Sequence, residues 1–252
     1  MELLRRARRA ARVLPCVVVV VVLLVSCTPA PRPFVHGRVF HGYTFDACTA
    51  PSVGTMQRWL SSRFRAVGIY IGGANRACSQ PQLSSQWVAA VRQQHWKLLP
   101  LYVGLQAPCT TASRVAVLNP SHAGRDGRDA ATDAVRRAKA LGMGQGTPIF
   151  YDMEAYGRDG LCIVAVRSFV NGWVNQLHAL GYVAGYYSSS ASGIKDLDQV
   201  YRDTRFAMPD HIWFANWANH QRHHQYRGGH DATYGGVTIN IDSSKSYGAV
   251  AG

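Results

Sequence analysis

Short apolar runs alternate with longer amphipathic segments from residue 39 to residue 252. Runs rich in apolar, β-branched and aromatic residues predict strands at Val39–Asp46, Val67–Ile71, Lys97–Val103, Pro148–Met153, Tyr182–Tyr187, His211–Asn216 and Val237–Ile241. Apolar residues at helical spacing predict helices over Ser52–Phe64, Pro81–Gln94, Arg125–Leu141, Ile163–Leu180 and, more weakly, residues 191–202. Because strands separated by helices of this length form parallel sheets, the pattern predicts an α/β fold.

The order of these elements favours a closed barrel over a dinucleotide-binding sheet. No Gly-x-Gly-x-x-Gly follows the first predicted strand, which argues against a dinucleotide fold. We therefore predict a single TIM-barrel-like (β/α) domain over residues 39–252, with a long loop over 104–124 and a polar, His-rich excursion over 218–235. A barrel of this kind has its active site at the C-terminal ends of its strands.

The first 27 residues have the pattern of an export signal. Residues 1–12 hold five arginines and one acid, and residues 13–25 are apolar, a run shorter than the about 20 residues that a membrane span needs. The run ends Leu24-Val25-Ser26-Cys27, the form of a bacterial lipobox in which Cys27 is lipidated. Paired arginines also allow a twin-arginine route. We predict a signal peptide with lipobox over 1–27 and a Pro-rich tether over 28–38; a plain secretory signal with an incidental cysteine is the alternative.

These features place the domain outside the membrane, either lipid-anchored through Cys27 to the outer face or secreted. The formal net charge of +13 includes five arginines and one glutamate within the signal, which leaves about +9 for the rest. A basic exported domain suits an anionic partner such as a cell-wall polymer or anionic lipid. The basic residues are scattered and no nucleic-acid motif accompanies them, so we expect no nucleic acid as partner. We expect a monomer.

The histidines of the 218–235 excursion do not indicate a metal site. His220, His223 and His224 lack a Glu-x-x-His frame and a helical context, so a solvated basic loop is the better interpretation. We expect neither a metal nor a cofactor.

Cysteine content agrees with export. Without the signal, four cysteines remain: Cys48, Cys78, Cys109 and Cys162. An even set in an oxidising compartment predicts two disulfides. The four allow three pairings, between which the sequence alone does not choose. None lies in a Cys-x-x-Cys pair, which argues against a zinc site or a redox motif.

Carboxylates stand where predicted strands end. Asp46 ends the first strand, Asp152 and Glu154 lie at the end of the fourth, and Asp242 follows the last. Asp152 and Glu154 are two residues apart, so their side chains share one face of an extended segment, and their repulsion should raise one pKa. Paired carboxylates across a sugar bond perform glycoside hydrolysis. The alternative is that these acids cap loops and bind arginine or backbone N–H groups.

Aromatic residues near the same strand ends predict a sugar-binding rim. Flat rings suit the C–H faces of sugars, and their polar tips can bond hydroxyl groups. The candidate sugar-binding residues are Tyr70, Tyr102, Tyr186, Trp213 and Trp217, with Tyr151 and Tyr187 in similar positions. The alternative is that half of them belong to the core, because strand residues alternate inward and outward.

Motifs along residues 40–245 resemble the actinobacterial family of exported glycoside-hydrolase-like domains. The resemblance is carried by Phe45-Asp46-Ala-Cys48-Thr-Ala-Pro51-Ser52, Gly68-Ile-Tyr70-Ile-Gly72-Gly73, Pro148-Ile-Phe-Tyr-Asp152-Met-Glu154, Gly181-Tyr-x-x-Gly185-Tyr-Tyr187-Ser188 and Trp213-Phe-Ala-Asn-Trp217. It implies a TIM-barrel-like fold similar to the glycoside hydrolase family 25 muramidases. In that similar family a first-strand Asp, an Asp-x-Glu pair and a late Asp form the active site.

By motif match these catalytic residues fall on Asp46, Asp152, Glu154 and Asp242, with Glu154 as the proton donor. The late segment departs from the muramidase pattern, since it has Thr238-Ile-Asn-Ile-Asp242 instead of the usual Asp-Leu-Asn. In a barrel, Cys48 and Cys78 follow neighbouring strands, and so do Cys109 and Cys162. We therefore predict the pairs Cys48–Cys78 and Cys109–Cys162, which would staple the rim of the cleft.

The predicted function is an exported cell-envelope glycoside hydrolase that cleaves peptidoglycan glycan. Glu154 would protonate the glycosidic oxygen, and Asp152 or Asp46 would stabilise positive charge, activate water or orient an acetamido group. Retention and inversion stay open, because they depend on carboxyl separations. The alternative function is a non-catalytic module that binds cell-wall glycan on the same barrel.

Overall fold

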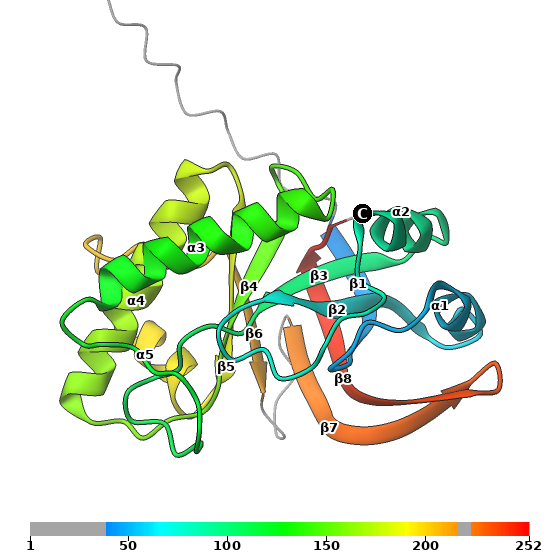
Figure 1. The fold of residues 1–252 in the computed structure, drawn as a ribbon. Helices are drawn as coiled ribbons and strands as arrows, with labels where there is room; N and C mark the ends of the chain where they lie inside the picture. Colours follow the sequence, from blue (N-terminus) through cyan, green and yellow to red (C-terminus); the bar gives the residue numbers. More distant parts are fainter. Residues whose placement is uncertain (1–38, 216–222, 252) are drawn as a thin grey trace, which may run out of the picture. The chain divides into compact units, whose positions relative to one another are not determined.

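The computed structural model describes residues 39–215 and 223–251 (Figure 1). The predicted signal peptide, the tether, Cys27 and Trp217 lie outside the described residues. Within the described ranges, no helix is both long enough and apolar enough to cross a membrane.

The described strands form a closed barrel in chain order. They are β1 (Val39–Asp46), β2 (Phe64–Gly72), β3 (Lys97–Tyr102), β4 (Pro148–Met153), β5 (Val183–Ser189), β6 (His211–Ala215), β7 (His223–Tyr234) and β8 (Val237–Ala249). Neighbours from β1 to β7 are parallel, and β8 is antiparallel to both β7 and β1. The predicted TIM-barrel-like α/β fold is therefore confirmed. It departs from a regular barrel at β7 and β8, which form an antiparallel hairpin and are not joined by a helix.

Helices follow each of the first five strands. They are α1 (Val53–Trp59), α2 (Ser85–Gln93), α3 (Ala123–Ala140), α4 (Gly160–Ala179) and α5 (Gly193–Asp198). Side-chain oxygens of Ser52, Ser84 and Asp159 cap the backbone N–H groups at the starts of α1, α2 and α4. The helix predicted over Ser52–Phe64 ends at Trp59 instead, because Phe64 is needed as the buried first residue of β2.

Helices α3 and α4 lie in close backbone contact (Figure 1). A Cβ at Gly127 would lie 2.1 Å from the carbonyl oxygen of Phe169, and a Cβ at Gly172 would lie 2.1 Å from that of Gly124. Only glycine lets the two backbones approach so closely. The pair of helices covers one side of the barrel as a unit.

The predicted His-rich excursion over 218–235 is wrong over its described part, because residues from His223 on form strand β7. Exposed and half-buried positions alternate from Tyr226 to Tyr234, which is the pattern of a ribbon with one face in solvent. The turn Gly235-Gly236 has positive φ at both residues, 56° and 74°, as a two-residue hairpin requires. The polar composition of β7 led to the prediction of a loop, although the alternation of positions and the Gly-Gly turn are both typical of a hairpin strand.

The β7–β8 hairpin packs on α1. The Trp59 ring nitrogen donates a hydrogen bond to the Val237 carbonyl oxygen at 3.1 Å, and the Tyr234 ring stacks edge-on against Trp59 with centroids 5.2 Å apart. Strand β8 continues to Ala249 instead of ending at Ile241 as predicted, so Asp242 lies inside a strand.

Alternation along the strands separates two apolar clusters. Outward-facing residues pack against the helices, whereas the barrel interior is filled by Leu99, Leu101, Phe150, Trp213 and Val250. The interior cluster includes Leu101 and Trp213, which also line the pocket that holds the predicted acids.

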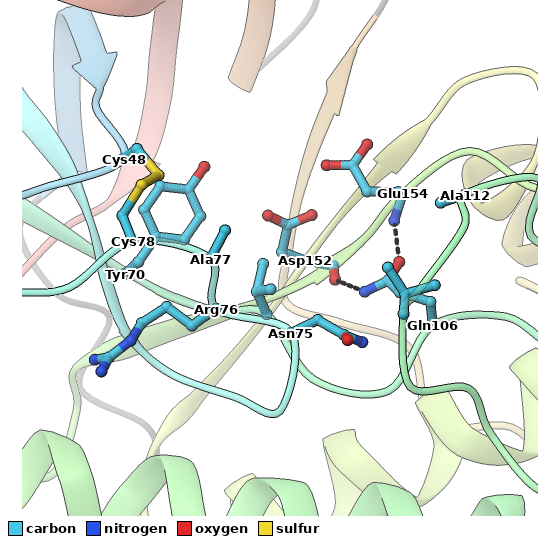
Figure 2. A pocket seen from close by; sticks show the side chains of 12 residues that line it. Cys48, Tyr70, Asn75, Arg76, Ala77, Cys78, Gln106, Ala112, Asp152 and Glu154 are labelled. Carbon is cyan, nitrogen blue, oxygen red and sulfur yellow. Dashed lines mark hydrogen bonds between the residues drawn. A yellow bond between two sulfur atoms is a disulfide. The ribbon is translucent and has the colours of Figure 1, made fainter.

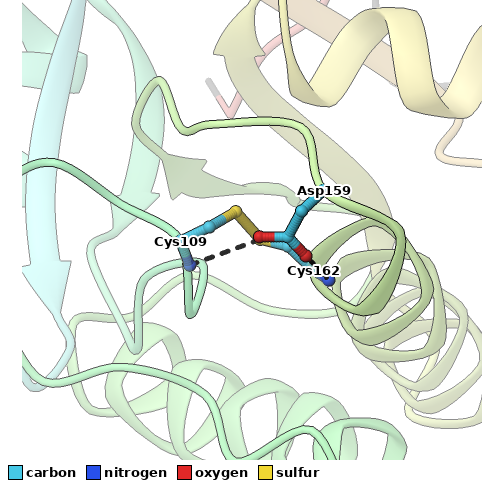
Figure 3. A group of neighbouring side chains, drawn as sticks. All are labelled: Cys109, Asp159 and Cys162. Carbon is cyan, nitrogen blue, oxygen red and sulfur yellow. Dashed lines mark hydrogen bonds between the residues drawn. A yellow bond between two sulfur atoms is a disulfide. The ribbon is translucent and has the colours of Figure 1, made fainter.

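Both predicted disulfides are confirmed. Cys48 is bonded to Cys78 and Cys109 to Cys162, with Cα separations of 5.6 and 6.0 Å. Asp159 lies beside the second bridge, and its carboxylate accepts the Cys162 backbone N–H at 2.8 Å as the cap of α4 (Figure 3). Since both sulfurs are used in the S–S bond, this trio lacks the thiolates that a zinc site needs.

Candidate active site

The end of β1 places Asp46 beside Asp242. The two residues are directly paired between β1 and β8. On the other side of β1, Asp46 is paired with Gly68 of β2. A Cβ at Gly68 would lie 2.6 Å from the Asp46 Cβ, so the glycine makes room for the carboxylate. Asp242 is half-buried and accepts a hydrogen bond from the Gly229 backbone N–H. The long β7–β8 hairpin thus positions the fourth acid.

The structure brings all four predicted acids together. Asp46, Asp152, Glu154 and Asp242 line one small pocket of about 30 Å³, enough for a water molecule, at the C-terminal ends of β1 and β4. The rest of the pocket wall is formed by Tyr70, Leu101, Tyr187, Trp213 and Gln225. Residues more than 190 positions apart in the chain therefore share one site.

A larger cleft of about 230 Å³ adjoins this pocket and shares Tyr70, Asp152 and Glu154 with it (Figure 2). Its other walls are the Cys48–Cys78 disulfide, Asn75, Arg76, Ala77, Val103, Gln106, Ala112 and Val115. The first disulfide therefore forms part of the cleft wall, as the sequence predicted for the rim. The shared residues make the cleft the approach to the acids.

Two of the acids are buried without cationic partners. Asp46 is 5% exposed and Asp152 is 3% exposed, and one carboxylate oxygen of each has no hydrogen-bond partner. Among the described residues, no lysine or arginine forms an ion pair with either. Burial, the Asp242 charge and the Glu154 charge raise the pKa of Asp46, although the Tyr70 hydroxyl, 3.2 Å away, lowers it in part.

Asp152 and Glu154 interact through their side chains, and the pKa of each is raised. Burial raises the pKa of Asp152 well above its usual value, and the charges of Glu154 and Asp46 raise it further. Glu154 is exposed at the cleft, yet desolvation by the surrounding protein raises its pKa too, while its hydrogen bond with Asp152 lowers it. A carboxyl group that is reachable from the cleft and has a raised pKa suits a general acid near neutral pH.

We expect Asp46→Asn to stabilise the fold at neutral pH. The native pKa of Asp46 is raised, whereas its unfolded value stays at about 4, so the native state holds an extra proton between the two and stability falls as pH rises through that window. Because the asparagine carries no charge to bury, the variant should unfold at a higher urea concentration than the wild type at pH 7. Below about pH 3 both states are protonated and the gain should vanish.

Urea unfolding at pH 3 and pH 7 measures this gain. The matched control is Asp129→Asn, which changes an exposed acid on α3 and should alter stability by no more than about 0.5 kcal/mol at either pH. An Asp46→Asn protein that gains nothing at pH 7 would show that the acid is not held at an electrostatic cost.

Two of the predicted sugar-binding residues do not line the site. The Tyr102 hydroxyl donates a hydrogen bond to Asp133 of α3 at 2.9 Å, and Tyr186 is fully buried in the outer core beside Gly193 of α5. Strand alternation turns both outward, as the core alternative anticipated. Tyr70 and Trp213 line the acid pocket.

The pocket and the cleft also contain Tyr187, which the sequence placed near a strand end, and two glutamines that the sequence did not single out. The Tyr187 hydroxyl donates a hydrogen bond to the buried Gln225 side chain at 2.8 Å, and both line the acid pocket. With Tyr186 outward, alternation requires Tyr187 to point inward. Gln225 belongs to the segment predicted as a loop, and Gln106 to the predicted long loop, so neither had a periodic signal.

A family model described as Rv2525c-like, glycoside hydrolase-like domain matches residues 57–246. No curated protein matches the chain. The Mycobacterium tuberculosis Tat-secreted protein Rv2525c, solved with L-tartrate, is similar in structure with a TM-score of 0.60 and 13% identity over 81% of this chain and 95% of that one.

An autolysin and the catalytic domain of an endolysin have similar folds. The modular autolysin LytC from Streptococcus pneumoniae gives a TM-score of 0.53 at 12% identity, over 81% of this chain and 46% of that one. The catalytic domain of endolysin ply40, from bacteriophage P40 of Listeria monocytogenes, gives 0.50 at 14% identity, over 82% and 93%. At these identities the likeness concerns the fold alone.

Proposed function

The chain belongs to the Rv2525c-like, glycoside hydrolase-like domain family, and we propose that it is a cell-envelope glycoside hydrolase that cleaves the glycan of peptidoglycan. The observation that carries the proposal is the convergence of four carboxylates from β1, β4 and β8 on one pocket at the end of an open cleft. Acid/base cleavage of a glycosidic bond needs two carboxyl groups whose different environments give them different pKa values.

In the proposed mechanism Glu154 donates its proton to the glycosidic oxygen. Its raised pKa keeps it protonated closer to neutral pH, and its place at the cleft lets a substrate reach it. Asp152 and Asp46, deeper in the pocket, stabilise the positive charge that develops on the sugar ring or orient an acetamido group or water. The reaction needs no cofactor.

The proposed substrate is a wall glycan held by aromatic side chains. Tyr70 and Trp213 offer rings beside the acids, and Trp217 stays a proposed contact from outside the described residues. LytC has been crystallised with a synthetic peptidoglycan ligand, and its fold is similar to this one, which supports peptidoglycan as the substrate class.

We further propose that the protein works as a monomer outside the membrane. The proposal combines the signal peptide with lipobox over 1–27, lipid anchoring at Cys27 and the tether over 28–38. The two disulfides support an oxidising compartment, and the basic charge suits an anionic wall.

The test is release of reducing ends and loss of turbidity with purified peptidoglycan. Release by the wild type supports the proposed hydrolase. Binding to insoluble peptidoglycan without any release would favour the non-catalytic wall-binding module instead. A protein that neither binds nor cleaves would overturn both functions.

A further inference from the structure

Gln106 makes a two-sided contact with the backbone around the catalytic pair. It is 3% exposed and lies on the loop that follows β3. Its side-chain nitrogen donates to the Asp152 carbonyl oxygen at 2.9 Å, and its side-chain oxygen accepts the Glu154 backbone N–H at 2.8 Å (Figure 2). One amide therefore bonds both residues of the Asp-x-Glu motif.

These two bonds continue the β3–β4 ladder beyond the last paired residues. Backbone pairing between the strands reaches only Tyr102 and Tyr151, and β4 ends at Met153. The Gln106 amide supplies the donor and acceptor that a further strand residue would have provided. It thus keeps Asp152 and Glu154 extended, the conformation in which side chains two residues apart point to the same side.

The Gln106 side-chain amide and its two bonds form a clamp on the Asp-x-Glu segment, and the backbone of Gln106 is itself held in the cleft wall. The Gln106 backbone N–H donates to Ala116 and its carbonyl oxygen accepts the Leu118 N–H, each at 2.9 Å. Asn75 holds Ala116 by both its N–H and its carbonyl oxygen, at 2.8 Å each. The Gln106 amide is therefore anchored independently of the residues that it holds.

We propose that Gln106 is the positioning residue of Glu154: it holds the Glu154 carboxyl beside Asp152 and aims it into the cleft. Gln106 acts through the backbone and takes no part in proton transfer. The kinetic consequence rests on the proposed function, whereas the geometric consequence can be measured in the absence of any substrate.

The chain offers a matched control for this clamp. Gln80 donates to the Cys48 carbonyl oxygen at 2.7 Å and accepts the Ala50 N–H at 2.9 Å. It makes the same pair of bonds to residues two apart, on a segment after β1 that carries none of the four acids. Replacing Gln80 removes an equivalent clamp without touching the Asp-x-Glu segment.

The experiment compares Gln106→Met with Gln80→Met by carboxyl-selective NMR titration. Glu2 and Glu154 are the two glutamates of the chain, and Glu2 lies in the proposed signal peptide, so ¹³C-labelled glutamate marks the Glu154 carboxyl alone in the processed protein, and Glu154→Gln confirms the assignment. Among the described residues, the ionisable groups that line the pocket and cleft with Glu154 are Asp46, Tyr70, Arg76, Asp152, Tyr187 and Asp242, which neither variant changes. In the wild type Glu154 should titrate in steps coupled to Asp152.

In Gln106→Met the coupling should be lost and the Glu154 titration should move towards that of an ordinary glutamate, whereas Gln80→Met should match the wild type. If the Met variant loses its near-ultraviolet circular dichroism, Gln106→Asn, whose shorter amide cannot span both bonds, decides by the same criterion. A Glu154 titration that Gln106 variants leave unchanged, or shift no more than Gln80→Met does, overturns the proposal.

Kinetics separate this proposal from the proposed function. On soluble peptidoglycan fragments, Gln106→Met should lower kcat about 10-fold to 100-fold with KM changed less than about 3-fold, because a misplaced acid weakens the transition state and leaves ground-state contacts intact. If the wild type is inactive and the NMR titrations give the expected result, the proposed hydrolase function is overturned and the positioning role of Gln106 is retained. An unchanged kcat in a Gln106 variant of an active enzyme would overturn the clamp alone.

Discussion

Glu154→Gln is expected to lower the release of reducing ends from peptidoglycan by about 100-fold to 10,000-fold, the range for losing a general acid. The glutamine keeps the shape of the side chain and has no proton to transfer. Folding should be preserved, because Glu154 is exposed at the cleft and its backbone N–H still bonds Gln106. Initial rates at several pH values, with circular dichroism of both proteins, provide the measurement.

Asp129→Asn on the surface of α3 is the matched control and should retain full activity. The wild-type rate should also fall as pH rises, because the proton on Glu154 is lost above its raised pKa. Equal rates in wild type and Glu154→Gln would remove Glu154 from the role of proton donor. Asp152, the other acid of the Asp-x-Glu motif, would then be the first candidate for that role.

Replacing both Cys109 and Cys162 by serine is expected to lower the free energy of unfolding by about 4 kcal/mol. The bridge joins residues 53 positions apart, and a cross-link of that span removes this much chain entropy from the unfolded state. The same change should loosen the loop after Glu154, because the Cys109 carbonyl oxygen accepts the Gly157 N–H at 3.1 Å. Urea unfolding under non-reducing conditions measures the loss.

The Cys48/Cys78 double serine variant is the comparison. That bridge joins residues 30 positions apart, so the loss should be slightly smaller, at about 3.5 kcal/mol. A double variant at Cys109 and Cys162 as stable as the wild type would contradict the argument, since it would mean that the unfolded chain is already restricted there.

Much of the architecture could be predicted because it depends on local pattern. Apolar runs and amphipathic segments mark β1 to β6 and their helices, and the acids Asp46, Asp152 and Glu154 lie at the ends of β1 and β4. Barrel order then implies that Asp46 and Asp152 meet at one end and that Cys48 lies near Cys78, whereas Asp242 reaches the site from within the antiparallel strand β8. These conclusions need only periodicity and the topology of parallel strands, which neighbouring residues along the chain already encode.

The tertiary structure decided which side of each strand faces the site and what lies opposite. Tyr102 and Tyr186 lie on strands at the site but point outward, whereas Tyr187 points in, because strand phase is set by packing against the helices. Strand β7 was concealed by its polar residues, since a ribbon with one solvated face needs few apolar ones.

The contact of Gln106 with the Asp-x-Glu segment shows most directly what cannot be predicted from the sequence. A buried glutamine in a long loop has no periodic signal, and its partners lie 46 and 48 residues further along the chain. The amino-acid sequence by itself determined the barrel, its acids and its disulfides, because those follow from local pattern and strand order. Only the tertiary structure decided the clamp on Glu154 and the shape of the cleft, because both depend on contacts between loops whose conformations are set by packing.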